Sequence, residues 1–247
     1  MKLTITLEGE TKGIVLPIHH NHFIQAALYQ LLDPIYASFL HEQGYAYEKR
    51  QFRLFSFSRL LGKFSLQPRE SAITFIGPIK LVVLTPLKPI SQGIVNSFIM
   101  GKEFRIGSQQ LFSTGVQLDY PAASSRKIRI RSLSPIVSYS TLERHDGSKF
   151  TYYFEPSERD FSRLVAGNLY RKWQAWKRDT DLAEVNFDFS IKPLHSIKRR
   201  IIMYKGIVIK GYSGHYLLEG EPRYLEFALN VGLGAKGSQG LGVVEKV

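Results

Sequence analysis

Residues 2–32 read KLTITLEGETKGIVLPIHHNHFIQAALYQLL and predict a strand followed by a helix. Apolar and polar side chains alternate from Lys2 to Glu8, which is the period of a half-buried strand. After the N-cap candidates His20 and Asn21, apolar residues recur at helical spacing and form one face, which comprises Phe23, Ile24, Ala27, Leu28, Leu31 and Leu32. An amphipathic β-α unit therefore opens the chain.

The next elements extend this unit into a recognisable order. A second, short helix is predicted to be capped by Asp33, to stop at Gly44 and to bury Ile35, Tyr36, Phe39 and Leu40. Strands are expected at 52–57, 72–76 and 79–84, followed by a helix at 89–100 and a strand at 109–118. This β-α-β-β-α-β order is that of a ferredoxin-like fold.

The second half repeats the order after a break. Residues 120–125, YPAASS, have no periodicity and place a domain boundary between Asp119 and Lys127. Strands are then expected at 127–130, 136–140, 150–154 (an inserted ribbon), 185–191, 201–218 and 241–246, and helices at 157–177 and 221–231. The segment 201–218 is predicted to be a hairpin that turns near Lys205-Gly206 or Ser213-Gly214. We expect an α+β protein of two tandem ferredoxin-like domains with antiparallel sheets, residues 1–120 and 121–247.

The composition indicates a globular protein with a polyanionic partner. The chain has 247 residues, with 33 Lys and Arg against 21 Asp and Glu, a net charge of +12. At 44% hydrophobic residues, it can form a proper core and is not a disordered basic tail. Residues 1–120 carry 12 basic and 8 acidic side chains and residues 121–247 carry 21 and 13, so the second half should supply more of the polyanion contacts.

Several kinds of chemistry and location are excluded or disfavoured. The absence of cysteine rules out disulfides, cysteine zinc sites and thiol nucleophiles. The histidines lack metal-binding helix spacings, and the tract HHNH at 19–22 lies where a helix begins, so capping or surface roles are favoured. We predict no metal and no cofactor. No apolar run approaches the roughly 20 residues needed to cross a bilayer, and the N-terminus lacks signal-peptide features, so we expect a cytoplasmic protein without a membrane partner.

The most specific motif is GLGAKGSQGLG at 232–242. Its first three spaced glycines satisfy GxGxxG, but a dinucleotide fingerprint must open a helix inside a βαβ unit, and the sequence ends at Val247. A Walker A loop fails as well, because Lys236 is followed by Gly237 rather than Ser or Thr. Two interpretations remain: a glycine loop whose exposed amides approach phosphates or bases, and a flexible tail.

Two Gly-hydrophobic-Gly triplets, 232–234 and 240–242, are separated here by five residues. In this the sequence resembles the CRISPR repeat-processing endoribonucleases of the RAMP superfamily, the Cas6 family. The resemblance covers nearly the whole chain and is also carried by the segments LP at 16–17, NH at 21–22, ALY at 27–29, FLH at 39–41, FRLFSFS at 52–58 and LSPI at 133–136. It implies the tandem ferredoxin-like fold and a metal-free cleavage of CRISPR repeat RNA (pre-crRNA), in which a ribose 2′-hydroxyl attacks the adjacent phosphate and leaves 5′-hydroxyl and 2′,3′-cyclic phosphate ends.

Such cleavage needs a base, an acid and a cation for the phosphorane. Spacing alone favours ordinary surface roles for His41 and Tyr29, and the resemblance reverses this. His41 lies near the end of the second helix, where the dipole favours imidazolium and hence the acid role. Tyr29 can orient or deprotonate the 2′-hydroxyl. The resemblance implies a lysine where this chain has Arg53, which stabilises charge but transfers no proton; Lys49 and Arg50 are alternatives for that lysine role.

RNA contacts are predicted from basic side chains interleaved with aromatic ones. The predicted RNA-binding set comprises Arg129, Arg131, Lys198, Arg199, Arg200, Lys205, Gly232, Gly234, Lys236, Gly240 and Gly242. The charges on the helix that carries Trp173 and Trp176, Lys172 among them, are interpreted as a solvated face.

Two other functions stay open. A non-catalytic RAMP-type RNA-binding subunit of a CRISPR effector complex shares the fold, the basic surface and the glycine loop. An RRM-like messenger-RNA binder is disfavoured because the sequence has no RNP1 string. Coordinates in which Tyr29 and His41 face one basic cleft favour the nuclease over the binding subunit. The recognised repeat, association with an effector complex and homodimer formation are left open by the sequence.

Overall fold

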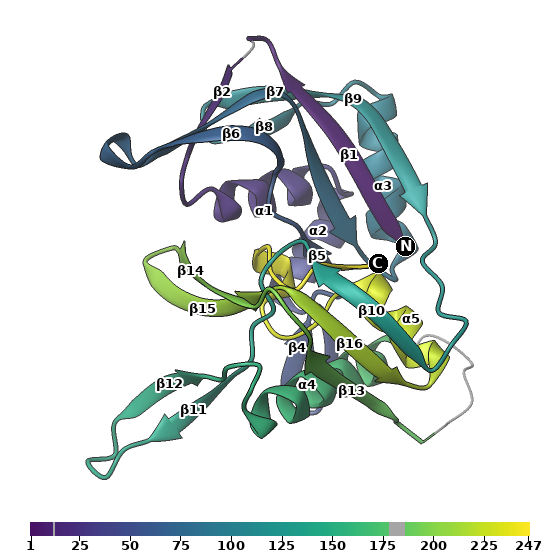
Figure 1. Cartoon of the computed structure of the whole chain (residues 1–247). Helices are drawn as coiled ribbons and strands as arrows, with labels where there is room; N and C mark the ends of the chain where they lie inside the picture. The colour runs from purple at the N-terminus through teal and green to yellow at the C-terminus, as the bar shows by residue number, and fades with distance from the viewer. Residues whose placement is uncertain (12, 178–185) are drawn as a thin grey trace.

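The computed structural model describes residues 1–11, 13–177 and 186–247, and it shows an α+β protein with antiparallel sheets (Figure 1). The first half contains β1 (Lys2–Gly9), β2 (Gly13–Pro17), α1 (Asn21–Gln30), α2 (Pro34–Glu42), β3 (Tyr45–Tyr47), β4 (Arg50–Phe52), β5 (Ser56–Phe57), β6 (Leu61–Gln67), the 3-10 turn η1 (Pro68–Glu70), β7 (Ala72–Leu84), α3 (Lys88–Ile99), β8 (Phe104–Ile106) and β9 (Gln109–Asp119). Its sheet has the order β2-β7-β1-β9-β8, with β5 and β6 also paired to β7.

The second half begins with β10 after the irregular segment that follows β9. It contains β10 (Lys127–Ser132), β11 (Tyr139–Glu143), β12 (Lys149–Tyr153), α4 (Arg159–Lys177), β13 (Phe189–Pro193), β14 (Lys198–Tyr204), β15 (Ile207–Ser213), β16 (His215–Gly220), α5 (Pro222–Val231), the 3-10 turn η2 (Gly237–Gln239) and β17 (Val244–Lys246). Its four-stranded sheet has the order β13-β16-β10-β17, and β11-β12 and β14-β15 form separate ribbons.

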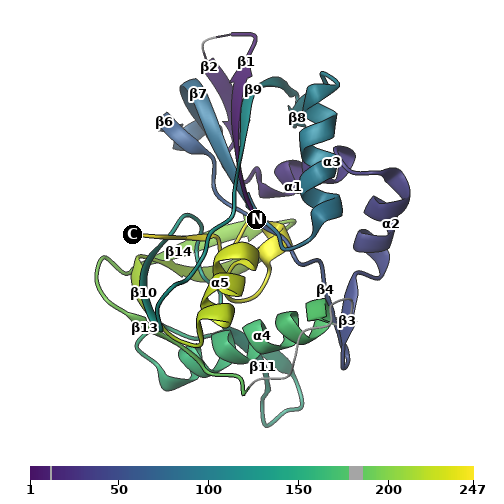
Figure 2. The ribbon, with the colours of Figure 1, turned by 90° about the vertical axis from the view of Figure 1, so that its right-hand side faces the viewer.

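Both sheets place their four principal strands in the same order. When these four strands of each half are counted along the chain, they lie across the sheet in the order fourth, first, third, second. This is β9-β1-β7-β6 in the first sheet and β17-β10-β16-β13 in the second. Figure 2 shows α1 and α3 beside the first sheet, and α4 and α5 beside the second. The expected tandem ferredoxin-like fold is therefore confirmed. The β11-β12 ribbon is inserted between β10 and α4, and the β14-β15 ribbon is inserted between the strands β13 and β16.

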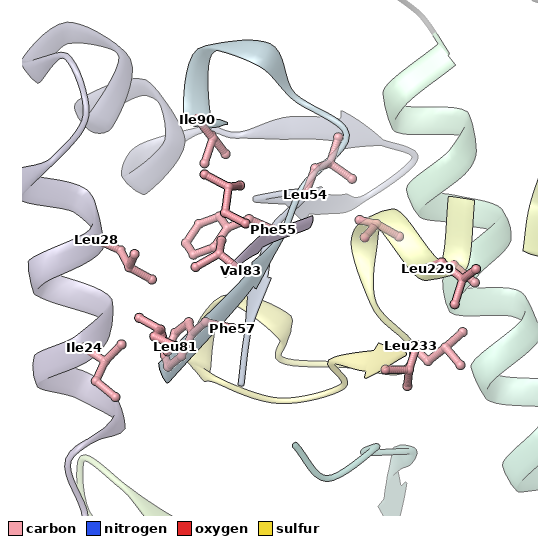
Figure 3. Packing of buried hydrophobic residues seen from close by; sticks show 14 of the residues in the cluster. Ile24, Leu28, Leu54, Phe55, Phe57, Leu81, Val83, Ile90, Leu229 and Leu233 are labelled. Atoms are coloured by element: carbon pink, nitrogen blue, oxygen red, sulfur yellow. The ribbon is translucent and has the colours of Figure 1, made fainter. Parts of the chain in front are cut away.

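The glycine segment, residues 232–242, joins the two halves in the core. The main buried cluster includes residues of both halves, among them Phe57 and Val83 from the first and Leu229 and Leu233 from the second (Figure 3). The Asn21 side chain on α1 donates to the Gln239 carbonyl at 2.9 Å. Packing of this segment thus fixes how the second half lies against α1 and β5.

Several strand predictions in the first half were wrong. Residues 52–57 do not form one strand, because Leu54 has a φ of 52° and breaks the extended backbone between β4 and β5. The predicted strands 72–76 and 79–84 are a single strand, β7. Its Gly77-Pro78 step falls where the neighbouring strand changes from β2 to β1, so the missing proline N–H breaks no ladder bond there. Ile35, predicted to be buried, is 82% exposed.

In the second half, the segment 136–140 forms only an isolated bridge between Ile136 and Tyr212 before β11 begins. The segment 201–218 turns at both proposed places, and at Gly214 the chain leaves the β14-β15 ribbon for the main sheet. The start of the predicted strand 185–191 lies outside the described residues. Within the described ranges, no helix has both the length and the apolar character needed to cross a bilayer.

Candidate active site

A cleft of about 900 Å³ opens between the two halves of the molecule. Its walls come from α1, the end of α2, residues 50–55, residues 137–141, α4, the tip of the β14-β15 ribbon and the glycine segment. None of the described residues that line it is an aspartate or glutamate, whereas the lining includes the cations Arg50, Arg53, Arg171, Lys172, Lys205 and Lys236. Uncompensated positive charge in a concave site attracts a polyanion.

The three predicted catalytic side chains meet in this cleft. The Tyr29 and His41 rings are 6.0 Å apart, centroid to centroid, and lie edge to face at 81°. The Arg53 guanidinium donates to the His41 backbone carbonyl at 2.5 Å. Tyr29 is half-buried, and its ring also packs against Phe55 at 5.8 Å. A hydroxyl, an imidazole and a guanidinium thus face one space.

The environment of the Tyr29 hydroxyl bears on which of its two expected roles, orienting or deprotonating the 2′-hydroxyl, is favoured. Burial raises the pKa of the Tyr29 hydroxyl, and the charge and hydrogen bond of Arg53 oppose this shift only in part. The neutral phenol is therefore the form present near neutral pH. A neutral phenol can orient a ribose hydroxyl by hydrogen bonding, but it is a poor base, so of the two roles expected for Tyr29 the environment favours orientation.

Interactions at both ends of helix α2 fix the position of His41. The Asp33 carboxylate accepts hydrogen bonds from the amides of Ile35 and Tyr36, each at 3.0 Å, as predicted for its capping role. At the other end Gly44 has a φ of 63°, and its amide donates to the Phe39 carbonyl. His41 consequently occupies the last turn with its side chain exposed to the cleft.

Arg50, one of the alternatives for the lysine position, also lines the cleft, whereas Lys49 does not. Arg53 is the member of the three that contacts both His41 and Tyr29. Arg53 thus lies beside the other two predicted catalytic residues, with Arg50 as a second cation in the same cleft.

The glycine segment differs from the exposed loop that the sequence suggested. The four triplet glycines are buried, and the amides of Gly232, Gly240 and Gly242 donate to protein carbonyls. A Cβ on Gly242 would lie 2.0 Å from the Leu233 carbonyl oxygen, and one on Gly232 would lie 2.4 Å from the Ser56 hydroxyl. The expectation of exposed amides is therefore wrong for these flanking residues, because without side chains Gly232 packs directly against Ser56 of the first half and Gly242 against Leu233 of the segment itself.

Only the middle of the segment, residues 235–239, lines the cleft. Lys236 has a φ of 62°, and its ammonium lies 5.4 Å from the Tyr139 ring centroid. Burial lowers the pKa of Lys236. The loop thus presents one cation, held over an aromatic ring, to the cleft.

The other predicted RNA-binding residues divide between the cleft and the outer surface. Lys205 at the tip of the β14-β15 ribbon lines the cleft, and the adjoining Tyr204 hydroxyl donates to Gln25 on α1. Lys198, Arg199 and Arg200 are exposed along β14 and lie outside the cleft lining. On β10, Arg129 and Arg131 are likewise outside it, and Arg131 pairs with Glu245 at 2.6 Å.

Sequence reasoning missed the contribution of α4. Asn168 and Arg171 line the cleft, and Lys172, interpreted as part of a solvated face, is buried. Lys172 falls on the apolar stripe that runs through Leu169 and Trp173, and this lysine at a core position was the signal that could have identified it. Among the described residues, no three His, Asp or Glu side chains are grouped to hold a metal ion.

The fold and the cleft define a protein of two ferredoxin-like units with a basic groove between them. Residues 118–246 match the family described as CRISPR associated protein Cas6, C-terminal. This match spans more than half of the sequence. The chain therefore belongs to the Cas6 family.

Known proteins resemble the chain over nearly its whole length. It is 25% identical over 249 residues to CRISPR-associated endoribonuclease Cas6 1 of Methanocaldococcus jannaschii, covering 99% of this chain and 93% of that protein. It is 22% identical to CRISPR-associated endoribonuclease Cas6 of Pyrococcus furiosus, covering 96% and 86%. A solved structure titled CRISPR associated protein Cas6 superposes with a TM-score of 0.79 at 23% identity, covering 100% and 99%.

Proposed function

We propose that this protein is a metal-independent endoribonuclease that binds CRISPR repeat RNA and processes pre-crRNA. The observation that carries the proposal is the convergence of Tyr29 and His41 on one cleft lined by cations. The relatives from M. jannaschii and P. furiosus are both named CRISPR-associated endoribonucleases, which supports the same activity here. A non-catalytic binding subunit has no need for this convergence.

In the proposed reaction, the 2′-oxygen of the scissile nucleotide attacks the adjacent phosphorus and the bond to the 5′-oxygen breaks. Tyr29 hydrogen-bonds the 2′-hydroxyl and orients it, and solvent water accepts the hydroxyl proton. Arg53 stabilises the negative charge that develops on the phosphorane. His41 donates a proton to the departing 5′-oxygen. The products are a 2′,3′-cyclic phosphate and a 5′-hydroxyl.

RNA binding is assigned to two groups of residues. Within the cleft, Lys205 and Lys236 contact phosphates beside the scissile bond, and the middle of the glycine segment forms the adjoining wall. Outside it, the exposed cations of β10 and β14 extend the positive surface for the flanking RNA; these are Arg129, Arg131, Lys198, Arg199 and Arg200. The flanking glycines Gly232, Gly234, Gly240 and Gly242 act by holding the loop in place.

The activity is tested with repeat RNA from the host under single-turnover conditions in EDTA. His41→Ala should slow cleavage by on the order of a hundredfold or more while RNA binding stays nearly intact. His145→Ala is the matched control, because His145 is exposed in the turn between β11 and β12. RNA with 2′-deoxyribose at the scissile nucleotide should bind and remain uncut. A requirement for magnesium in the cleavage step contradicts the proposal, and wild-type cleavage by His41→Ala removes the catalytic assignment.

Arg53→Lys tests how this chain uses an arginine at the position where the resemblance implies lysine. A lysine keeps the charge but cannot bridge the His41 carbonyl and the Tyr29 hydroxyl with one planar group. We expect the cleavage rate to fall by roughly tenfold, with RNA affinity changed little. An unchanged rate would show that position 53 supplies charge alone.

Further features of the assignment stay predictions. They are the division into domains at residue 120, a cytoplasmic location, association with a CRISPR effector complex and homodimer formation. Light scattering of the full chain, with and without repeat RNA, measures whether one or two copies are present.

A further inference from the structure

Lys172 is a buried cation, and both hydrogen bonds that its ammonium donates to described residues go to the glycine segment. Its ammonium donates to the carbonyl oxygens of Gly232 at 3.1 Å and Gly234 at 3.0 Å. Its side chain is 7% exposed and, among the described residues, it has no ion-pair partner. An ammonium without a counterion is costly to bury, so its retention in the core calls for a function.

The segment that Lys172 contacts leads directly to Lys236. Gly234 and Lys236 both have a positive φ, 73° and 62°, and the backbone of Lys236 is left-handed. An L-residue adopts this conformation only when its surroundings enforce it. Two hydrogen bonds hold the residues just before Lys236. The Lys172 ammonium donates to the Gly234 carbonyl, and the Ala235 amide donates to the Val137 carbonyl at 2.8 Å. Together they set the direction in which Lys236 leaves the core and enters the cleft.

We propose that Lys172 is a positioning residue for RNA binding, whose ammonium anchors the glycine segment so that Lys236 reaches a phosphate in the cleft. Lys172 borders the cleft but is buried, and its ammonium is engaged by the Gly232 and Gly234 carbonyls, so in this proposal it acts through Lys236 rather than by contacting RNA itself. This inference rests on the proposed function of the cleft as an RNA site. It assigns a role to a side chain that the catalytic proposal does not use.

A double-mutant cycle separates this role from a general effect on folding. The dissociation constant of uncleavable repeat RNA, with 2′-deoxyribose at the scissile nucleotide, is measured against salt for the wild type, Lys172→Met, Lys236→Met and the double variant. Each phosphate contact contributes about 0.7 to the log–log salt slope of single-stranded RNA, or roughly fivefold in affinity at about 0.1 M salt. Both single variants should lose about this much slope and affinity, and the double variant should lose no more than either.

A matched control and a rescue variant support the interpretation. Arg163→Met removes an exposed cation from the same helix and should leave the salt slope unchanged. Lys172→Arg keeps charged donors at the site and should recover most of the slope. If Lys172→Met does not fold, Lys172→Gln, which keeps an amide donor in the buried site, replaces it in the same cycle.

The outcomes distinguish this inference from the proposed function. Additive losses in the double variant, or a Lys172 variant with the wild-type slope, overturn the positioning role while leaving the RNA site intact. A wild-type protein that fails to bind repeat RNA overturns the proposed function itself. Weakened binding with an unchanged slope shows that Lys172 stabilises the fold without placing Lys236.

Discussion

Replacing Lys172 by methionine should change how the free energy of unfolding depends on pH. Burial lowers the pKa of the Lys172 ammonium from 10.5 to about 7. Between these values the unfolded chain holds a proton at this site that the folded chain has released. The free energy of unfolding therefore rises with pH across this range. The penalty for burying the charged form is fully present below pH 7 and disappears as the pH approaches 10.5.

The size of this change in the free energy of unfolding follows from the difference between the two pKa values of Lys172. One unit of pKa difference corresponds to about 1.4 kcal/mol, so the full penalty approaches roughly 5 kcal/mol. Between about pH 6.5 and about pH 8.5 the linkage amounts to about 2 kcal/mol. Lys172→Met has no titrating group at this site, so its free energy of unfolding should lack this increment.

Urea unfolding followed by circular dichroism at about pH 6.5, 7.5 and 8.5 measures the difference. Other groups contribute in both proteins and cancel in the comparison, including the Met1 amino group, whose pKa burial lowers to about 6. Arg163→Met should retain the wild-type pH dependence. Profiles for wild type and Lys172→Met that remain parallel to within about 0.5 kcal/mol would refute the reasoning, because the ammonium would then carry the same proton in both states.

Three further predictions concern the elements that build the cleft. Gly242→Ala should destabilise the protein by at least about 2 kcal/mol, because its φ is 76° and the new Cβ would meet the Leu233 carbonyl at 2.0 Å. Gly115 has open space around it, so Gly115→Ala should be nearly neutral. Thermal melting compares the two variants. Asp33→Ala should cost about 1 kcal/mol through loss of the α2 cap, measured by urea unfolding. The affinity of the wild type for repeat RNA should fall steeply with salt, and a flat dependence in a filter-binding titration would point to a partner other than a polyanion.

Element order was predictable because it depends on local patterns. The helical spacing of apolar residues in α1 and the Asp33-Pro34 start of α2 come from side chains that are near one another in sequence. The strands that were missed or divided depend on partners elsewhere in the chain. β6 has mostly exposed side chains and is a strand because it pairs with β7, and Gly77-Pro78 is tolerated within β7 because of where β1 and β2 meet.

The candidate site was predictable only where the family resemblance supplied the residues. Spacing alone gives His41 and Tyr29 surface roles, and nothing local indicates that their rings lie 6.0 Å apart. Arg171 and Asn168 enter the cleft because α4 packs beside the first half, a tertiary arrangement that no periodicity encodes. Lys172 is different, because its position on the apolar stripe of α4 is visible in the sequence. The prediction of a solvated face ignored this position.

The glycine motif shows why a recognisable pattern can point to the right place for the wrong physical reason. Its flexibility suggested a loop that offers free amides to RNA, yet Gly232, Gly234, Gly240 and Gly242 are buried where a Cβ would overlap protein atoms at 2.0 to 2.5 Å. The glycines allow the segment to pass between the halves, and the carbonyls of Gly232 and Gly234, both residues with positive φ, accept hydrogen bonds from Lys172. Close packing of the glycines and projection of Lys236 are therefore two results of one backbone conformation. A substitution that disturbs the packing should also misplace the cation.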